Sequence, residues 1–113
     1  MNILNFLRSR DEVSYQAWIP TKSGKLIMSV VCGQGLYSSP REKVKDTEEY
    51  TEVEVVFFNA ETNNWASYNE VKEAFPIIGE GEYYYSDEEL DESRSAVFGY
   101  VEVEKVNQVW EIL

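Results

Sequence analysis

The chain has 113 residues, 43% of them hydrophobic and 14% aromatic, which is enough apolar material for one folded domain spanning residues 1–113. Its formal net charge is −11, and the absence of histidine removes the commonest general base and metal ligand. A single cysteine, Cys32, excludes an intramolecular disulfide and a thiolate zinc site. The apolar runs are far shorter than the roughly 20 residues of a membrane span. The first cations follow the apolar residues, which reverses the order of a signal peptide, so we expect a cytoplasmic protein.

The first third of the chain predicts a short helix and a β-hairpin. Residues 2–7 have apolar side chains at helical spacing, and residues 13–20 alternate as a strand that ends at Pro20. Ser23-Gly24 predicts a two-residue turn. The nearly continuous apolar run 25–33 then predicts a central strand, in which we expect Cys32 to be buried. One face of the first strand is predicted to hold Val13, Tyr15, Ala17 and Ile19.

Residues 33–49, with two glycines, a proline and mixed charge, predict a long excursion. A strand follows, with a polar turn at 60–64, and a short helix is expected to open at Asn69 and stop at Pro76. Residues 95–103 predict another strand and residues 104–113 a terminal helix. In the strand before the polar turn, one face is predicted to hold Val53, Val55 and Phe57 and the other Tyr50, Glu52, Glu54, Val56 and Phe58.

This order of elements predicts the α+β class. We expect a single domain with a mainly antiparallel sheet of about four to five strands and short helices, including one at each end of the chain.

The stretch GEGEYYYSDEELDES, residues 79–93, holds seven carboxylates and three adjacent tyrosines without a cation. Ser86 and Glu89 match a capping box, so the acids are also compatible with the first turn of a short helix. An EF-hand alignment fails, because Glu92 would replace the required glycine and Phe98 the bidentate glutamate.

Composition argues against catalysis. Serine nucleophiles have no histidine partner, and neither GxGxxG nor GxxxxGK[ST] is present. Carboxylate pairs are so abundant that a glycosidase pair carries no weight without geometry. We predict that the protein is not an enzyme and uses no cofactor or metal.

Charge is distributed unevenly along the chain. Residues 1–45 hold seven cations and three carboxylates, net +4, whereas residues 46–113 are net −15. The acidic part would repel nucleic acid, so no direct nucleic-acid binding is expected. The basic residues Arg41, Lys43 and Lys45 are predicted to pair locally with Asp46, Glu48 and Glu49.

Rows of carboxylates suit a cationic surface built for nucleic acid, and tyrosines suit a protein interface. Glu52 and Glu54 are expected about 6.7 Å apart on one strand face, and Glu102 and Glu104 repeat the pattern if the strand reaches Glu104. The alternative is that the acidity serves solubility only, in a small regulatory or accessory protein-binding domain. The predicted partner-binding residues are Glu52, Glu54, Glu80, Glu82, Tyr83, Tyr84, Tyr85, Asp87, Glu88, Asp91 and Glu92.

In length, acidity and aromatic content the chain resembles, as a class, small phage-encoded anti-defence proteins, namely anti-restriction and anti-CRISPR inhibitors. The stretch SYQAWIPTKSGKLIMSVVCGQGLYSSPRE also looks like phage or prophage reading frames. The resemblance implies a non-enzymatic inhibitor of a nuclease or CRISPR effector, acting in the host cytoplasm, in some cases as a DNA mimic. It transfers no individual residue, and the positive N-terminal part departs from pure mimicry.

Overall fold

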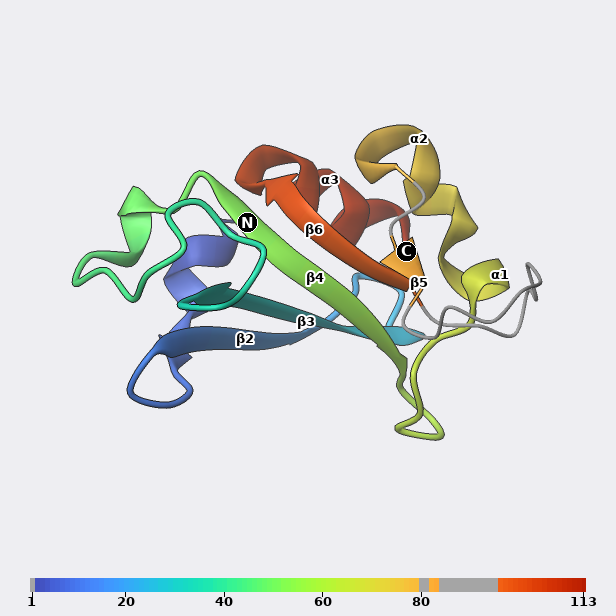
Figure 1. Ribbon diagram of the computed structural model, residues 1–113. Coiled ribbons are helices and arrows are strands. Elements are labelled where there is room, and N and C mark those ends of the chain that lie inside the picture. The colour runs from blue at the N-terminus through green and yellow to red at the C-terminus, as the bar shows by residue number, and fades with distance from the viewer. Residues whose placement is uncertain (1, 80–81, 84–95) are drawn as a thin grey trace.

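The computed structural model describes residues 2–79, 82–83 and 96–113. Within these ranges, six strands form an antiparallel sheet in the order β1-β2-β3-β4-β6-β5 (Figure 1). The predicted α+β fold with a mainly antiparallel sheet is confirmed. The two outermost strands have only two residues each, and β1 was not predicted. The strands are β1 (Arg8–Ser9), β2 (Ser14–Pro20), β3 (Leu26–Gly33), β4 (Glu52–Asn59), β5 (Glu82–Tyr83) and β6 (Ala96–Glu102).

Short helices cover one face of this sheet. Figure 1 shows α2 and α3 side by side next to β6, with α1 at the same end of the molecule as α2. The predicted helices at both ends of the chain are confirmed, the N-terminal one as a 3-10 turn. The helical segments are η1 (Ile3–Phe6), η2 (Thr47–Glu49), α1 (Tyr68–Val71), η3 (Lys72–Ala74), α2 (Phe75–Ile78) and α3 (Val103–Ile112).

The alternating patterns place one set of side chains in the core, as predicted. Phe57 and Phe98 meet edge to face there, with ring centroids 5.8 Å apart, and Val106 and Val109 pack against them from α3. Cys32 is fully buried, as predicted. We call the other side of the sheet the outer face. Its side chains include Gln16, Trp18, Ser29, Glu54, Val56 and Phe58.

Two expectations about the first strand are corrected. Val13 precedes β2 and is exposed, because residues 10–14 form a tight turn in which the Asp11 carboxylate accepts the Val13 N–H. The following turn is longer than predicted. Thr21 pairs with Leu26 through N–H to O (2.9 Å), leaving a loop of residues 22–25 in which Gly24 adopts φ 76°.

The predicted helix around residues 69–75 is present with different limits. Ser67 caps α1 and Glu70 closes a capping box, so Asn69 is not the cap. Pro76 does not stop the helix. It lies in the first turn of α2, where a missing N–H costs nothing. The capping box predicted at Ser86 and Glu89 lies outside the described residues.

Tyr50 was predicted to share a strand face with Glu52, and this is wrong. It precedes β4 and is buried, where its hydroxyl donates to the Glu42 carbonyl (2.6 Å) and accepts the Val44 N–H (3.3 Å). Tyr15 donates to the Val44 carbonyl as well. The two tyrosines thereby fasten the long excursion to the sheet.

Candidate functional site

Of the predicted partner-binding residues, the structure describes the side chains of Glu52 and Glu54. Glu82 and Tyr83 form strand β5, opposite Val97 and Ala96 of β6. The remaining predictions, which carry most of the acidic, tyrosine-rich stretch, lie outside the described residues. These are Glu80, Tyr84, Tyr85, Asp87, Glu88, Asp91 and Glu92.

Glu52 lies directly opposite a second glutamate. In the β4–β6 ladder its antiparallel partner is Glu102. The Glu52 carboxylate accepts the Ser39 hydroxyl at 2.8 Å, and Glu102 lies 3.6 Å from the exposed ammonium of Lys105. Like charges at directly opposed positions destabilise a sheet, so this arrangement is a local cost to the fold.

The same two glutamates line a surface groove at the end of β4 and β6, which we call the acidic groove. Glu104 contributes a third carboxylate. It lies in the first turn of α3, so the strand does not reach Glu104 and the condition for a strand pattern of Glu102 and Glu104 is not met. The Oδ1 atom of Asn107 is buried and has no hydrogen-bond partner among the described residues. The groove is lined by Asn2, Leu4, Tyr50, Thr51, Glu52, Glu102, Val103, Glu104 and Asn107.

Glu54 shares the strand face of Glu52 but has different surroundings. It is half-buried, and desolvation raises the pKa of its carboxyl despite the opposing effect of Arg10 and Arg41. With two guanidinium groups near it, Glu54 does not extend the negative surface of Glu52. Although Glu52 and Glu54 share a strand face, their electrostatic surroundings differ, so they do not act as one row of negative charge.

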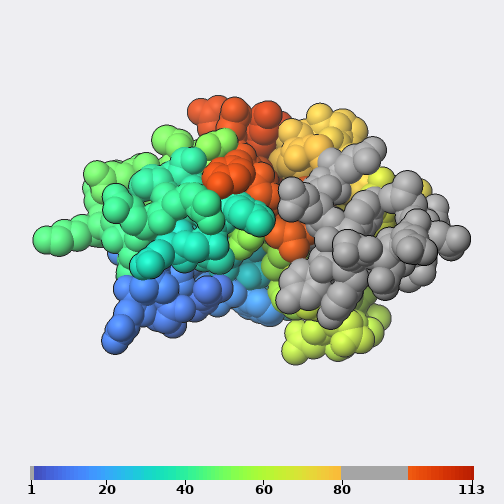
Figure 2. All heavy atoms as spheres, in the orientation of Figure 1, coloured from blue at the N-terminus to red at the C-terminus, as the bar shows by residue number. Residues whose placement is uncertain are grey.

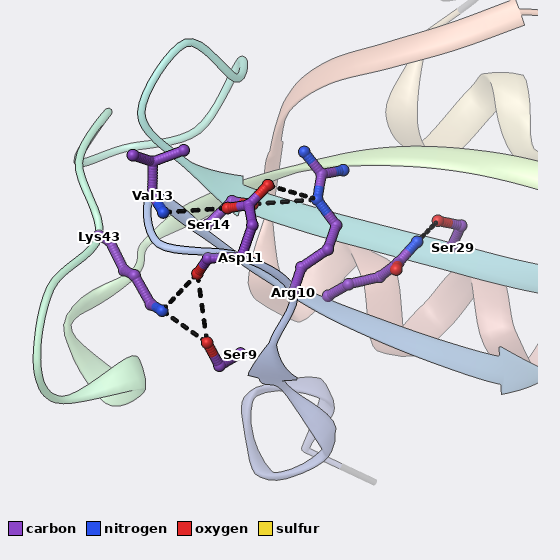
Figure 3. Close-up of polar contacts among 8 residues, drawn as sticks. Ser9, Arg10, Asp11, Val13, Ser14, Ser29 and Lys43 are labelled. Atoms are coloured by element: carbon purple, nitrogen blue, oxygen red, sulfur yellow. Dashed lines mark hydrogen bonds and ion pairs between the residues drawn. The ribbon is translucent and has the colours of Figure 1, made fainter.

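The basic residues of the excursion do not pair as predicted. The Lys43 ammonium donates to the Ser9 hydroxyl and to the Asp11 carbonyl, both at 2.6 Å (Figure 3). Arg41 donates to the Leu36 carbonyl instead. Asp46 is engaged elsewhere, because its carboxylate caps η2 by accepting the Glu48 N–H. Figure 2 shows the excursion, in teal, packed above the blue N-terminal segment that Lys43 reaches.

Sequence reasoning missed an aromatic series on the outer face. The rings of Trp18 and Phe58 lie 4.8 Å apart, and those of Phe58 and Trp65 lie 5.3 Å apart. Half of Trp18 is exposed, as is 38% of Trp65. The missing information was the register, since β3 lies between β2 and β4 and brings Trp18 to Phe58.

A second aromatic pair lies beside Glu54. Tyr37 packs against Gly99, where a Cβ would be only 2.9 Å from the Cβ of Tyr37. Its ring lies 5.7 Å from that of Tyr100 and carries the Arg41 guanidinium at 5.6 Å. Tyr100 has φ 51° at the irregular step of the β4–β6 ladder. A non-glycine residue in this region of φ/ψ space is uncommon.

Two further kinds of site concern the described residues, a metal centre and a reactive thiol. No group of three or more His, Cys, Asp or Glu side chains among them is placed to hold a metal ion. Burial raises the pKa of the Cys32 thiol to about 12, which suppresses the thiolate. In the part of the chain that the structure describes, no helix has the length and apolarity to cross a membrane.

Comparison of the chain with protein-family models, with curated proteins and with solved structures finds no match.

Proposed function

We propose that the protein is a non-enzymatic inhibitor that binds a nucleic-acid-handling protein through an acidic surface. The observation that carries this proposal is the direct opposition of Glu52 and Glu102 in the sheet. Two like charges opposite one another cost about 0.2–1 kcal/mol relative to a neutral pair. A lysine or arginine side chain placed between them removes the repulsion and gains from both carboxylates.

Other features of the acidic groove favour a cationic occupant. Glu104 adds a carboxylate to the same groove, and the Asn107 oxygen offers a buried acceptor. The two cations near Glu54 lie outside the groove lining. An ammonium or guanidinium group supplies donors to the Asn107 oxygen, which has no partner among the described residues, and to the carboxylates beside it.

The class of target is proposed from complementarity. Proteins that handle DNA or RNA present rows of lysine and arginine to phosphate, and an acidic surface competes for such rows. Residues 80–92 add seven carboxylates to the chain, which strengthens long-range attraction to such a target. We infer an inhibitor of a nuclease or CRISPR effector on this basis, acting in the cytoplasm.

A set of charge-matched variants tests this proposal. Glu52→Gln, Glu102→Gln and Glu104→Gln together neutralise the groove. Glu61→Gln, Glu73→Gln and Glu111→Gln neutralise three exposed acids elsewhere and give the same net charge. Both variants and the parent protein are titrated into DNA-cleavage assays with a panel of purified restriction and CRISPR nucleases.

Inhibition by the parent protein that is lost in the groove variant and kept in the control variant supports the proposal. Equal loss in both variants favours a non-specific effect of net charge. Absence of inhibition across the panel favours the alternative function, an accessory binding domain whose acidity serves solubility. The same preparations, screened for nuclease, esterase, glycosidase and phosphatase turnover, are expected to show none.

A further inference from the structure

The outer face of the sheet carries exposed aromatic side chains that do not line the acidic groove. Trp18, Phe58 and Trp65 form a continuous series of ring contacts. Tyr37 and Tyr100 add a second pair on the side of Gly99. Exposed large aromatic side chains that gather on one face mark interaction surfaces, whereas single exposed apolar residues do not.

Cations accompany these rings. The hydrogen bond and ion pair of Arg10 use its Nε atom, which lies 3.0 Å from the Ser14 hydroxyl and 3.6 Å from Asp11 (Figure 3). Arg41 also uses Nε for its bond to Leu36. Among the described residues, no hydrogen bond donated by the terminal nitrogens of either guanidinium is found. The Arg41 guanidinium lies 5.6 Å from the ring centre of Tyr37, and both guanidinium groups act on the pKa of Glu54, a side chain of the outer face.

We propose that the outer face is a second protein-binding surface, and that its occupant is a polypeptide segment carrying a carboxylate beside large apolar side chains. The apolar side chains of this segment pack on the aromatic series, and its carboxylate accepts hydrogen bonds from the guanidinium groups of Arg10 and Arg41. Tryptophan, tyrosine and arginine are the residues that dominate protein interfaces energetically.

Charge complementarity selects this occupant over a basic one. A lysine-rich segment on the outer face would meet two guanidinium groups, whereas the acidic groove attracts it elsewhere. An acidic segment is repelled by the chain as a whole, at net −11, and finds favourable contacts beside the guanidinium groups of Arg10 and Arg41. The two surfaces therefore prefer partners of opposite charge.

The strained backbone at Tyr100 fits this role. Its φ of 51° turns the strand at the bulge, and its N–H is held by the Tyr37 carbonyl at 2.8 Å. The missing side chain of Gly99 leaves room for the side chain of Tyr37 to contact β6 at this position. Bulges of this kind re-aim side chains at functional surfaces, and here the bulge holds Tyr100, whose ring lies 5.7 Å from that of Tyr37.

The experiment uses a random-peptide display library selected on the immobilised protein. We expect enrichment of peptides that combine Asp or Glu with Leu, Ile, Phe or Trp. The three tryptophans give a built-in reporter in ¹H–¹⁵N spectra. A selected peptide should shift the indole signals of Trp18 and Trp65. The indole signal of Trp110, whose N–H is hydrogen-bonded to the Pro20 carbonyl, should stay unchanged.

Matched variants locate the contact. Trp18→Ala should weaken binding by roughly tenfold or more, while Phe6→Ala, an equally exposed ring (47%) on η1, should have no effect. Arg10→Gln and Arg41→Gln should each weaken binding by roughly tenfold, and Lys72→Gln should not. The groove triple variant should bind normally, which separates this proposal from the inhibitor proposal.

Four results would overturn the inference. They are enrichment of lysine- or arginine-rich peptides, no enrichment above the uncoated support, binding that shifts only Trp110, and binding that persists in both Trp18→Ala and Arg41→Gln. Concentration-dependent dimerisation that is abolished by Trp18→Ala would mean that the outer face binds a second copy of the chain. Binding of single-stranded DNA that shifts the Trp18 signal would mean that it binds nucleic acid. Either result would overturn the proposed peptide partner.

Discussion

Trp110 of α3 donates its indole N–H to the carbonyl of Pro20, the last residue of β2, across 2.9 Å. The contact continues along the backbone, because Lys22 donates its N–H to the Trp110 carbonyl at 3.1 Å. The Ser23 hydroxyl donates to the Leu113 carbonyl. These bonds hold the end of α3 against the turn between β2 and β3.

Trp110→Phe removes the indole donor and keeps most of the ring. We expect the free energy of unfolding to fall by about 0.5–1.5 kcal/mol, the usual net value of one hydrogen bond. Urea unfolding followed by circular dichroism measures it. Trp18→Phe is the control, since no hydrogen bond of the Trp18 indole is found within the described residues. Equal losses in the two variants would contradict the role of the bond.

Glu54→Gln should stabilise the protein at neutral pH. The pKa of Glu54 is raised in the folded state by desolvation, so the folded protein favours the protonated form. The contribution to stability is full below the ordinary value of 4.5 and is lost as pH rises through the folded pKa. The free energy of unfolding of the variant should therefore be higher than that of the parent at pH 7 and equal to it at strongly acidic pH. Urea unfolding at a series of pH values measures both.

Asp11→Asn should destabilise the protein at neutral pH, the opposite of the effect expected for Glu54→Gln. A hydrogen bond from the Ser14 hydroxyl, with the Val13 N–H and Arg10, lowers the pKa of Asp11. Its contribution is present above the ordinary value of 3.8 and is lost as pH falls. The asparagine variant should be the less stable protein at pH 7. If stability depended on pH in the same way in Glu54→Gln and in Asp11→Asn, the local environments of the two carboxyl groups would not determine their pKa values.

Gly99→Ala should destabilise the fold by roughly 1–3 kcal/mol, a typical cost of overpacking. The new methyl group would lie 2.9 Å from the Cβ of Tyr37, which is too close for both to remain. The penalty should largely disappear in a Tyr37→Gly background, because that change removes the opposing Cβ. A penalty of the same size in both backgrounds, measured by urea unfolding, would rule out this contact as the cause.

Glu52→Gln should raise the free energy of unfolding by about 0.2–1 kcal/mol, because it removes one of two opposed like charges. The glutamine oxygen still accepts the Ser39 hydroxyl. Glu61→Gln changes the net charge equally at an exposed turn position and should have a smaller effect. Stability lost on Glu52→Gln would mean that the carboxylate is structural.

The Cys32 thiol should resist alkylation in the folded protein. It is fully buried, and desolvation raises its pKa to about 12. Labelling with iodoacetamide at pH 8 should therefore proceed only as fast as the protein unfolds, and become rapid in denaturing urea. Fast labelling without denaturant would show that this part of β3 opens locally.

Sequence pattern predicted the elements of this fold better than the contacts between distant ones. A two-residue turn at Ser23-Gly24 and the observed loop both place Pro20 opposite Ile27, so the local hairpin register followed from the turn residues. The register of β3 against β4 lies beyond an excursion of many residues, and no local signal sets it. The aromatic series therefore escaped prediction.

The acidic groove illustrates the same limit. Glu52 was identified as a candidate by its place on a strand, yet its opposition to Glu102 depends on pairing between β4 and β6, far apart in the chain. The strand pattern of Glu102 and Glu104 does not form because α3 begins at Val103, directly after the strand. Charge counts identify acidic segments, while the spatial grouping of charges requires the tertiary structure.

The short outermost strands have a consequence for how the molecule behaves in a crowded solution. β1 and β5 have two residues each, so neither offers a long row of backbone donors and acceptors to a strand of another molecule. Where β2 extends beyond β1, Pro20 has no N–H and its carbonyl is taken by Trp110. Lateral growth of the sheet into filaments is thereby blocked at this point by a proline and an indole, independently of the electrostatic repulsion between acidic chains.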